Sequence, residues 1–400
     1  MVSGNVVALG TVSLITDVSA EMVAAVLPLY LVLGLQLSPV AFGVLDGVHT
    51  GATALLRVVG GYAADRFQRR KLIAGIGYTL SAVAKLGLLL AGRSIPAIGA
   101  VIAADRLGKG VRSAPRDALI TLSTPPEALG RAFGVHRAMD SFGAFLGPLA
   151  AFAVLLVVGQ SYDAVFVTSF CVAALAVVVL VLFVRERPPG EVKKGEPKVS
   201  VREALGLFRG GPARRLVLAA AMLGLATIGD GFVYLLLQRR EDLGLRWFPL
   251  LAVGTSLAYL LLAAPLGVLA DRIGRLPVVI GGYVALGATY LLLAGPVDGW
   301  PLIVLTLTLY GAFYAATDGV LIALAGPVLP ARLRTTGIAL VQTGQALAYL
   351  VSSVLFGLAW QVFGPETAIR AAAAAVAGVL VLTLLLLVSP SRLSIRKVPR

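Results

Sequence analysis

Residues 267–277 read GVLADRIGRLP, and residues 61–71 read GYAADRFQRRK. Both stretches carry the spacing G-x-x-x-D-R-x-x-R, and each ends an apolar run long enough to cross a membrane. Asp17 in ITD likewise corresponds to Asp230 in IGD. The chain therefore contains two similar halves that enter the membrane from the same side. Parallel repeats of this kind are related by an axis along the membrane normal, and they place a substrate site between the halves near mid-bilayer.

The composition excludes several classes of protein. The 400 residues are 58% hydrophobic and 14% charged, with a mean hydropathy of +0.92, whereas a soluble domain has about 45–50% apolar and about 25% charged residues. The chain is too apolar for an ordinary soluble enzyme and too rich in aliphatic residues for a disordered protein. The net charge of +14 is typical either of nucleic-acid binding or of basic cytoplasmic loops in a membrane protein.

Twelve apolar stretches reach the length of roughly 20 residues that a membrane-spanning helix requires. They cover residues 5–33, 40–64, 72–92, 95–119, 132–158, 164–184, 214–238, 247–270, 277–296, 300–325, 336–362 and 367–388. The connections between them are too short for a soluble domain. We therefore expect an all-α polytopic membrane protein, with twelve transmembrane helices in two pseudo-symmetric six-helix bundles.

One long connection, residues 185–213, divides the two bundles. It is charged and contains four prolines, and its VSVREALGLFR stretch predicts a short amphipathic helix on the membrane surface. The N-terminal bundle then covers residues 1–184, the C-terminal bundle 214–390, and a basic tail 391–400. The chain offers no sequence reason to expect a further domain.

The basic residues are distributed unevenly between the two sides of the membrane. If the N-terminus lies inside, 22 Lys and Arg residues fall on the inside segments and five on the outside loops. The positive-inside rule then predicts that both termini are cytoplasmic. We expect the plasma membrane, or inner membrane, of a bacterium, with the lipid bilayer as the main partner. Topology accounts for the basic excess, so nucleic acid is not an expected partner.

These features together resemble the major facilitator superfamily of transporters, over essentially the whole chain, and within it the branch of twelve-helix drug:proton antiporters. The family signature between its second and third spans reads G-x-x-x-D-R/K-x-G-R-R/K. The first copy departs from it at Gln68, where the family prefers glycine, and the second copy matches better. The matching residues are Gly61, Asp65, Arg66, Arg69 and Arg70 in the first copy, and Gly267, Asp271, Arg272, Gly274 and Arg275 in the second.

The resemblance implies a gating role for this motif. Asp65 would cap the cytoplasmic start of the span 336–362, since a carboxylate suits a helix N-terminus. Arg69 would pair with Asp117 at the end of the span 95–119 and hold the outward-facing state closed inside. The alternative is that these residues only set topology and solubility, although aspartate adds nothing to positive-inside retention.

The span 132–158 contains Gly143-x-x-x-Gly147-Pro148. It resembles the antiporter motif of the family, G-x-x-x-G-P-x-x-G-G, with alanines at or beside the last glycine positions. Small residues let helices pack closely, and Gly-Pro permits a bend. The alternative is general small-residue packing. The antiporter interpretation favours export driven by inward proton flow.

Asp17 and Glu21 lie four residues apart in the span 5–33, and therefore on one helix face about 6 Å apart along the axis. Ionisable residues inside a membrane are costly and usually functional. Two neighbouring carboxylates in a low dielectric cannot both stay ionised cheaply, which suits a proton-coupling or substrate site. The alternative is that both acids are fixed partners of cations on the span 95–119.

The span 95–119 carries a polar stripe at i, i+4, i+7 and i+11 that must face the interior. Its members are Asp105, Lys109, Arg112 and Arg116. Arg112 is the candidate partner of Asp17 or Glu21, because a guanidinium can bind a carboxylate with two hydrogen bonds. The family has the motif R-x-x-x-G-x-G here, and this chain has R-x-G-x-G from Arg106. Either Arg106 or Arg112 could therefore take the role of the family's arginine.

Histidines beside acids are possible proton relays. His136 and Asp140 are four apart on one face of the span 132–158, and Asp46 and His49 lie close together in the span 40–64. A histidine that titrates near neutral pH could relay protons, although a lone histidine is more often simply hydrogen-bonded. No metal-ligand spacing appears, so we expect no metal site and no cofactor.

The C-terminal half contains fewer ionisable residues, so we expect it mainly to shape the pocket. Pockets for small organic ligands are apolar with a few placed polar groups. Packing in the core is the alternative role for each aromatic residue. The candidates for the pocket wall are Asp230, Tyr234, Tyr259, Tyr310, Phe313, Tyr314, Asp318, Gln342 and Gln345.

The sequence thus predicts a secondary transporter, expected to be a monomer, that exports a small amphipathic compound in exchange for protons by alternating access. A proton symporter or an anion or metal-ion carrier of the same fold is the alternative within transport. A receptor or scaffold with a transporter-like fold is the alternative outside it, but a scaffold has no reason to bear the cost of buried charges. No nucleophile–base pair or metal motif suggests an enzyme.

Overall fold

The computed structural model describes residues 3–51, 69–125, 128–159, 161–186, 211–318 and 334–388. These residues form helices joined by short loops, and no strand occurs among them. Ten of the helical stretches are long and apolar enough to cross a membrane. Helix α4 and the helical segment 39–51 stand at the two remaining expected spans. The expected all-α fold with two six-helix halves is confirmed.

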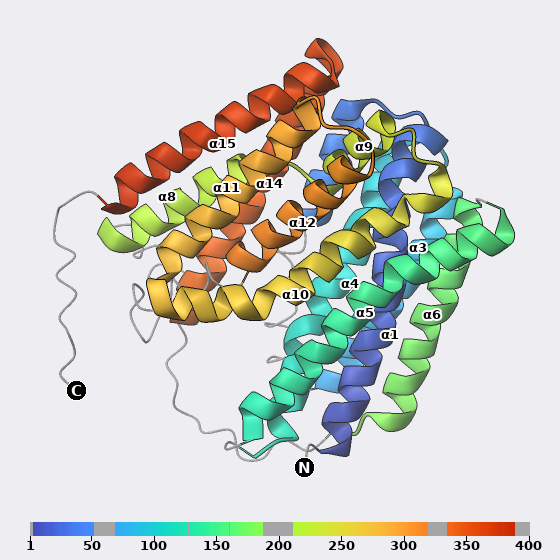
Figure 1. Cartoon of the computed structure of the whole chain (residues 1–400). Coiled ribbons are helices and arrows are strands. Elements are labelled where there is room, and N and C mark those ends of the chain that lie inside the picture. Colours follow the sequence, from blue (N-terminus) through green and yellow to red (C-terminus); the bar gives the residue numbers. More distant parts are fainter. Residues whose placement is uncertain are drawn as a thin grey trace, which may run out of the picture.

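The described part of the N-terminal half contains six helical segments, which lie side by side in Figure 1. They are α1 (Gly4–Leu29, extended by the π-helical turn Tyr30–Gly34), the helical segment 39–51, α3 (Arg70–Leu90), α4 (Ile95–Leu122), α5 (Leu129–Val158) and α6 (Tyr162–Phe183). Helix α1 packs mainly against α5 and α6, and α3 packs against α4 and α6. Helix α4 is not among the ten apolar stretches because charged residues interrupt it.

The C-terminal half follows the same plan. Its elements are α8 (Gly211–Leu225), α9 (Asp230–Arg240), the 3-10 turn η4 (Leu245–Trp247), α10 (Pro249–Ile273), α11 (Arg275–Ala294), α12 (Gly299–Thr317), α14 (Arg334–Phe363) and α15 (Pro365–Val388). Most of the connection 185–213 and the whole tail 391–400 lie outside the described residues.

The expected span 214–238 corresponds to the apolar helical stretch Arg214–Arg240, but the chain leaves the helix within it, between Leu225 and Asp230. Gly229 is extended there, with φ −63° and ψ 143°. The hydroxyl of Tyr290 on α11 accepts a hydrogen bond from the backbone N–H of Ile228 (3.0 Å) and donates one to the carbonyl of Ala226 (3.5 Å). This side chain satisfies backbone groups that the break leaves without helical partners, as a buried break requires.

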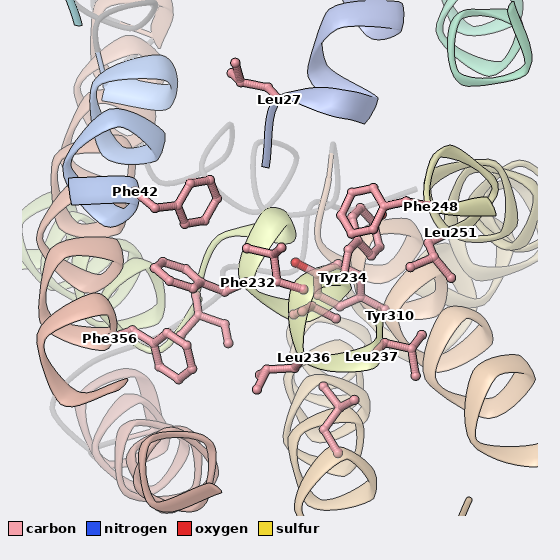
Figure 2. Close-up of a cluster of buried hydrophobic side chains, with 14 of the residues drawn as sticks. Leu27, Phe42, Phe232, Tyr234, Leu236, Leu237, Phe248, Leu251, Tyr310 and Phe356 are labelled. Carbon is pink, nitrogen blue, oxygen red and sulfur yellow. The ribbon is translucent and has the colours of Figure 1, made fainter. Parts of the chain in front are cut away.

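The two halves meet at the end of the bundle opposite the N-terminus, which we call the far face; the end at which α1 begins is the terminal face. In Figures 1 and 2, α9 lies beside the N-terminal half, and Phe42 points toward Phe232. The ring of Phe232 lies 4.7 Å from that of Phe42 and 4.9 Å from that of Phe356. These edge-to-face contacts join the segment 39–51, α9 and α14 in one apolar cluster.

Backbones also touch across the halves at the far face. A Cβ atom on Gly43 would overlap the carbonyl oxygen of Ser353, and one on Gly357 would overlap that of Pro39. The segment 39–51 and α14 therefore approach as closely as helices can, which is what small residues at a membrane interface permit.

Candidate functional site

Asp17 and Arg112 face each other between α1 and α4. An Nη2 atom of Arg112 lies 4.0 Å from Oδ1 of Asp17, and the guanidinium stacks 4.7 Å from the ring centre of Tyr78 on α3. The arrangement is an ion pair reinforced by a cation–π contact, without the two hydrogen bonds of bidentate binding. Arg112 is almost fully buried, whereas 17% of the Asp17 side chain remains exposed. The acid is therefore the accessible member of the pair.

Glu21 lies one turn farther along the same face of α1. Its Cβ atom and the carbonyl of Val18 leave no room for a side chain at Gly147, since a Cβ there would lie 2.5 Å from that of Glu21. Glu21 thus lies where α5 packs tightly on α1.

Arg106 has a different partner from Arg112. Its guanidinium donates hydrogen bonds from Nε (2.9 Å) and Nη2 to Oδ2 of Asp105, its neighbour in α4. The other carboxylate oxygen accepts a hydrogen bond from Ser81 and pairs with Lys85 at 3.5 Å. The structure therefore places Arg112 against Asp17 of α1, whereas Arg106 is bound by Asp105. Lys85, which has no evident role in the sequence, is a partner of Asp105.

A small pocket lies against this cluster, inside the N-terminal half. It is lined by apolar residues of α1, α3 and α4 and by the four polar residues His49, Lys85, Asp105 and Arg106. His49 therefore lies at the Asp105 cluster. Asp46, three residues earlier, lies instead at the boundary with the C-terminal half.

Asp46 connects the halves near the break between α8 and α9. Its Oδ2 atom accepts a hydrogen bond of 2.7 Å from the hydroxyl of Ser353 on α14. The same carboxylate and the hydroxyl of Tyr349 lie directly against Gly229. A Cβ atom added to Gly229 would be 3.0 Å from the Tyr349 oxygen and closer still to Asp46. The packing of Asp46 and Tyr349 on this backbone therefore requires glycine at position 229.

Asp230 is held by two tyrosines of α12. The hydroxyl of Tyr310 donates to Oδ1 at 2.7 Å, and that of Tyr314 donates to the same atom. The ring of Tyr234 packs edge-on against that of Tyr310, with 6.3 Å between the centres (Figure 2). Of the expected pocket wall, these four residues form one cluster. It lies at the start of α9, beside the break.

Phe313 also borders this cluster. Its ring centre lies 5.1 Å from that of Tyr314 and 6.0 Å from that of Tyr310, and it packs on Tyr283 at 5.1 Å. The hydroxyl of Tyr259 donates to Oδ2 of Asp318 at 3.4 Å, toward the terminal-face end of the C-terminal half. Gln342 and Gln345 are half-buried on α14, whose Gln345 carbonyl packs against Gly224 of α8.

The motif on α5 packs directly onto α1. A Cβ atom at Gly143 would lie 2.5 Å from the carbonyl oxygen of Leu14, and Pro148 follows the similarly crowded Gly147 within a continuous helix. One and two turns before Gly143, on the terminal-face side, are Asp140 and His136, whose Oδ1 and Nδ1 atoms are 4.0 Å apart. The same face of α5 thus carries the glycines and the possible relay.

The gating motif is described only in part. Gly61, Asp65 and Arg66 lie outside the described residues, whereas Arg69 is exposed and Arg70 is buried at the start of α3. In the second copy, Asp271 and Arg272 are exposed at the end of α10, and Gly267 and Arg275 are half-buried. Gly274 has φ +100°, which allows the tight turn between α10 and α11.

The expected pair of Arg69 with Asp117 is not formed in this structure. Asp117 pairs instead with its neighbour Arg116 (3.0 Å), which also donates a hydrogen bond to Ser13 (3.1 Å). The described contacts of Phe42, Asp46 and Gly357 with the other half lie at the far face, at the opposite end of the bundle from Asp117.

Three residues of the site are missed by the sequence analysis: Tyr78, Ser81 and Ser353. Each is a single polar group in an apolar span. Its role becomes visible only from its contact with a charged residue on another helix. Among the described residues, no group of three or more His, Cys, Asp or Glu side chains could hold a metal ion.

Comparison with known proteins identifies the family. The profile of the Major Facilitator Superfamily matches residues 9–254 and 248–400. An uncharacterised MFS-type transporter of Methanocaldococcus jannaschii is 30% identical over 374 residues, which cover 91% of this chain and 90% of that protein. An uncharacterised protein of Mycobacterium bovis is 37% identical over 154 residues, or 38% of this chain and 37% of that protein.

Solved structures share the fold at low sequence identity. The nucleoside transporter NupG superposes with a TM-score of 0.82 at 14% identity, covering 96% of this chain and 99% of that one. A POT family transporter in complex with 5-aminolevulinic acid gives 0.78 at 12% identity, with 97% and 96% covered. The human organic anion transporter MFSD10 gives 0.66 at 17%, with 96% and 99% covered. The chain therefore belongs to the major facilitator superfamily, and it is a multi-pass membrane transporter rather than an enzyme.

Proposed function

We propose that this transporter couples the movement of a small organic solute to protons at Asp17 and Glu21. The supporting observation is the ion pair between Asp17 and Arg112, in which the cation is buried and the acid is partly exposed. A proton on Asp17 would cancel its attraction to Arg112, and loss of that proton would restore the attraction. The charge on this pair therefore changes with protonation, as a coupling site requires.

Alternating access would link this site to both faces. The contacts that Phe42, Asp46 and Gly357 make with the opposite half lie at the far face, so we propose an inward-facing state in which the terminal face is cytoplasmic. A proton received in the outward-facing state would be released inward from Asp17 or Glu21 as the solute binds. Export is favoured by the resemblance of the α5 motif to the antiporter motif of the family, and its Gly143 and Gly147 pack this helix tightly on the segment of α1 that carries both acids.

The test uses purified protein in liposomes that contain a pH-sensitive dye. A pH gradient is imposed, compounds that differ in charge and size are added one at a time, and the internal pH is followed. Under the proposal, at least one compound dissipates the gradient in a protein-dependent way. Asp17→Asn and Glu21→Gln should reduce that response at least ten-fold.

The matched control is Asp163→Asn, which removes an exposed acid at the start of α6, away from the site. It should transport like the unaltered protein. If both site variants retain transport with unchanged pH dependence, the proton-site assignment is wrong. If anions dissipate an imposed membrane potential but not the pH gradient, the protein is an anion carrier and the basic stripe of α4 binds the anion.

A further inference from the structure

A small cavity inside the N-terminal half brings two cations together in apolar surroundings. Most of its wall comes from apolar side chains of α1, α3 and α4, and its polar members are His49, Lys85, Asp105 and Arg106. We call this space the Lys85 cavity. Lys85 and Arg106 are only 3% and 7% exposed. Both cations are therefore buried beside one space whose wall offers little solvation.

The charges at the Lys85 cavity do not cancel. Nζ of Lys85 lies 3.5 Å from Oδ1 of Asp105, and Arg106 pairs with Oδ2 of the same carboxylate. Among the described residues, neither cation forms an ion pair with a second acid. Two positive charges therefore share one negative charge. Because an uncompensated charge is costly to bury, the cluster favours a further negative charge in the cavity.

Hydrogen-bond donors outnumber acceptors in the same cluster. A carboxylate has about four lone-pair sites, and those of Asp105 are taken by the Ser81 hydroxyl, Nζ of Lys85, and Nε and Nη2 of Arg106. A second N–H of Lys85 donates to the carbonyl of Ser81 at 2.9 Å. The third N–H of Lys85 and Nη1 of Arg106 have no acceptor in the described part of the chain. An anion in the cavity would accept from both.

The Lys85 cavity has room for one small ion. Its volume is about 30 Å³, whereas one water molecule needs about 10–15 Å³. A chloride ion, which is somewhat larger than a water molecule, therefore fits, and the space is too small for sulfate or an organic acid. A water molecule would accept the same hydrogen bonds, but it would leave the excess positive charge in place. Chloride compensates the charge and accepts the hydrogen bonds together.

We propose that the Lys85 cavity binds one chloride ion, held by the third N–H of Lys85 and by Nη1 of Arg106. All the residues that line the cavity belong to the N-terminal half. The ion is therefore a fixed part of that half, and it is not a solute that passes between the halves. Asp17 and Glu21 do not line the cavity, so the chloride site does not depend on the proposed function.

Chloride binding is tested by thermal unfolding of the full chain in detergent. Sodium gluconate, whose anion is too large for the cavity, is replaced stepwise by sodium chloride at constant ionic strength. An ion that binds only the folded protein raises the apparent unfolding temperature, so we expect a rise that saturates as for one site per chain. Bromide should cause a similar rise, and sulfate at equal ionic strength should not. The absence of a saturable chloride effect would overturn the proposal.

Two charge variants should move the apparent Kd for chloride in opposite directions. Lys85→Met removes a donor and the excess charge, and should raise the Kd about ten-fold. Asp105→Asn increases the excess from one charge to two, and should lower the Kd several-fold. Arg131→Gln removes an exposed cation of α5 and is the matched control, with an unchanged Kd. Each variant is compared with itself in gluconate, so a loss of stability alone does not alter the result. An unchanged Kd in Lys85→Met would contradict the assignment.

A third variant changes the space and keeps every charge. Ala24 lines the cavity, and Ala24→Val adds two methyl groups there, so the Kd for chloride should rise about ten-fold. Crystals soaked in bromide then locate the ion, because bromide scatters X-rays anomalously. The expected anomalous peak lies within hydrogen-bonding distance of Nζ of Lys85. Full chloride binding by Ala24→Val, or bromide peaks only at other places, would show that the cavity does not hold the ion.

Discussion

An Nη2 atom of Arg112 on α4 lies 4.0 Å from Oδ1 of Asp17 on α1, and this contact joins the two most heavily charged faces of the N-terminal half. The guanidinium is at the same time stacked on Tyr78. Its position is therefore fixed by two neighbours with different chemistry. A change at either helix would alter the charge that Asp17 meets.

Arg112→Lys should lower substrate-dependent proton movement in liposomes about ten-fold, which corresponds to about 1.4 kcal/mol. Lysine retains the charge, but it has no planar group to stack on Tyr78 and presents a point charge that is more strongly hydrated. Arg131→Lys, at an exposed position of α5, is the control and should be unchanged. Full activity of Arg112→Lys would show that charge alone suffices at this position.

Gly143→Ala should destabilise the packing of α5 on α1, because the new Cβ would meet the Leu14 carbonyl at 2.5 Å with no flexible side chain to yield. We expect a fall of several degrees in the apparent unfolding temperature in detergent. Gly134→Ala, on the same helix with open space around it, should be neutral or slightly stabilising, because alanine favours the helix by about 1 kcal/mol. Equal effects of the two variants would contradict the close approach.

Ser353→Ala should loosen closure at the far face, because it removes the hydrogen bond to Asp46 across the halves. The reporter protein carries Cys171→Ser, which removes the native cysteine, and Phe42→Cys, which places a cysteine at the far face. The rate at which a membrane-impermeant maleimide labels this cysteine from the far face is then measured. Ser353→Ala should label several-fold faster than the reporter alone. Ser352→Ala removes a neighbouring buried hydroxyl and should not change the rate; if it accelerates labelling equally, the bond to Asp46 is not the cause.

Lys85→Met should lower the apparent unfolding temperature, because it leaves Asp105 with one cation fewer in a buried cluster. Removing one partner of a buried pair commonly costs about 3–5 kcal/mol, although Arg106 and Ser81 still bind Asp105 here. Adding Asp105→Asn should therefore cost less in the Lys85→Met background than in the unaltered protein. Simple additivity of the two changes would indicate that the residues do not interact.

The span positions could be predicted from composition, because a helix in lipid must be apolar over a fixed length. The pairing of Asp17 with Arg112 could also be predicted, since unpaired charges are too costly there and the stripe on α4 has one face. The break in the helix before Asp230 could not be predicted from the sequence. Apolar residues continue on both sides of it, and what makes it stable is Tyr290, which comes from a different helix.

The glycines also differ in whether their roles could be predicted from the sequence. Gly143 and Gly147 could be noticed in the sequence, because their spacing is a known pattern of close helix packing. Gly43 and Gly357 carry the contact between the halves, and nothing in their neighbourhood in the sequence distinguishes them from other glycines. Their role depends on which backbone lies opposite, and only the tertiary arrangement decides that.

The charge density of α4 has a consequence for how the protein is made. Its central turns hold Asp105, Arg106, Lys109 and Arg112, and each such residue opposes insertion of an isolated helix by about 2.5–3.5 kcal/mol. Residues 95–122 should therefore fail to insert when tested alone in a translocon assay and succeed when α1 and α3 precede them. The most highly charged helix of the N-terminal half would then enter the membrane only after its partners are already in place.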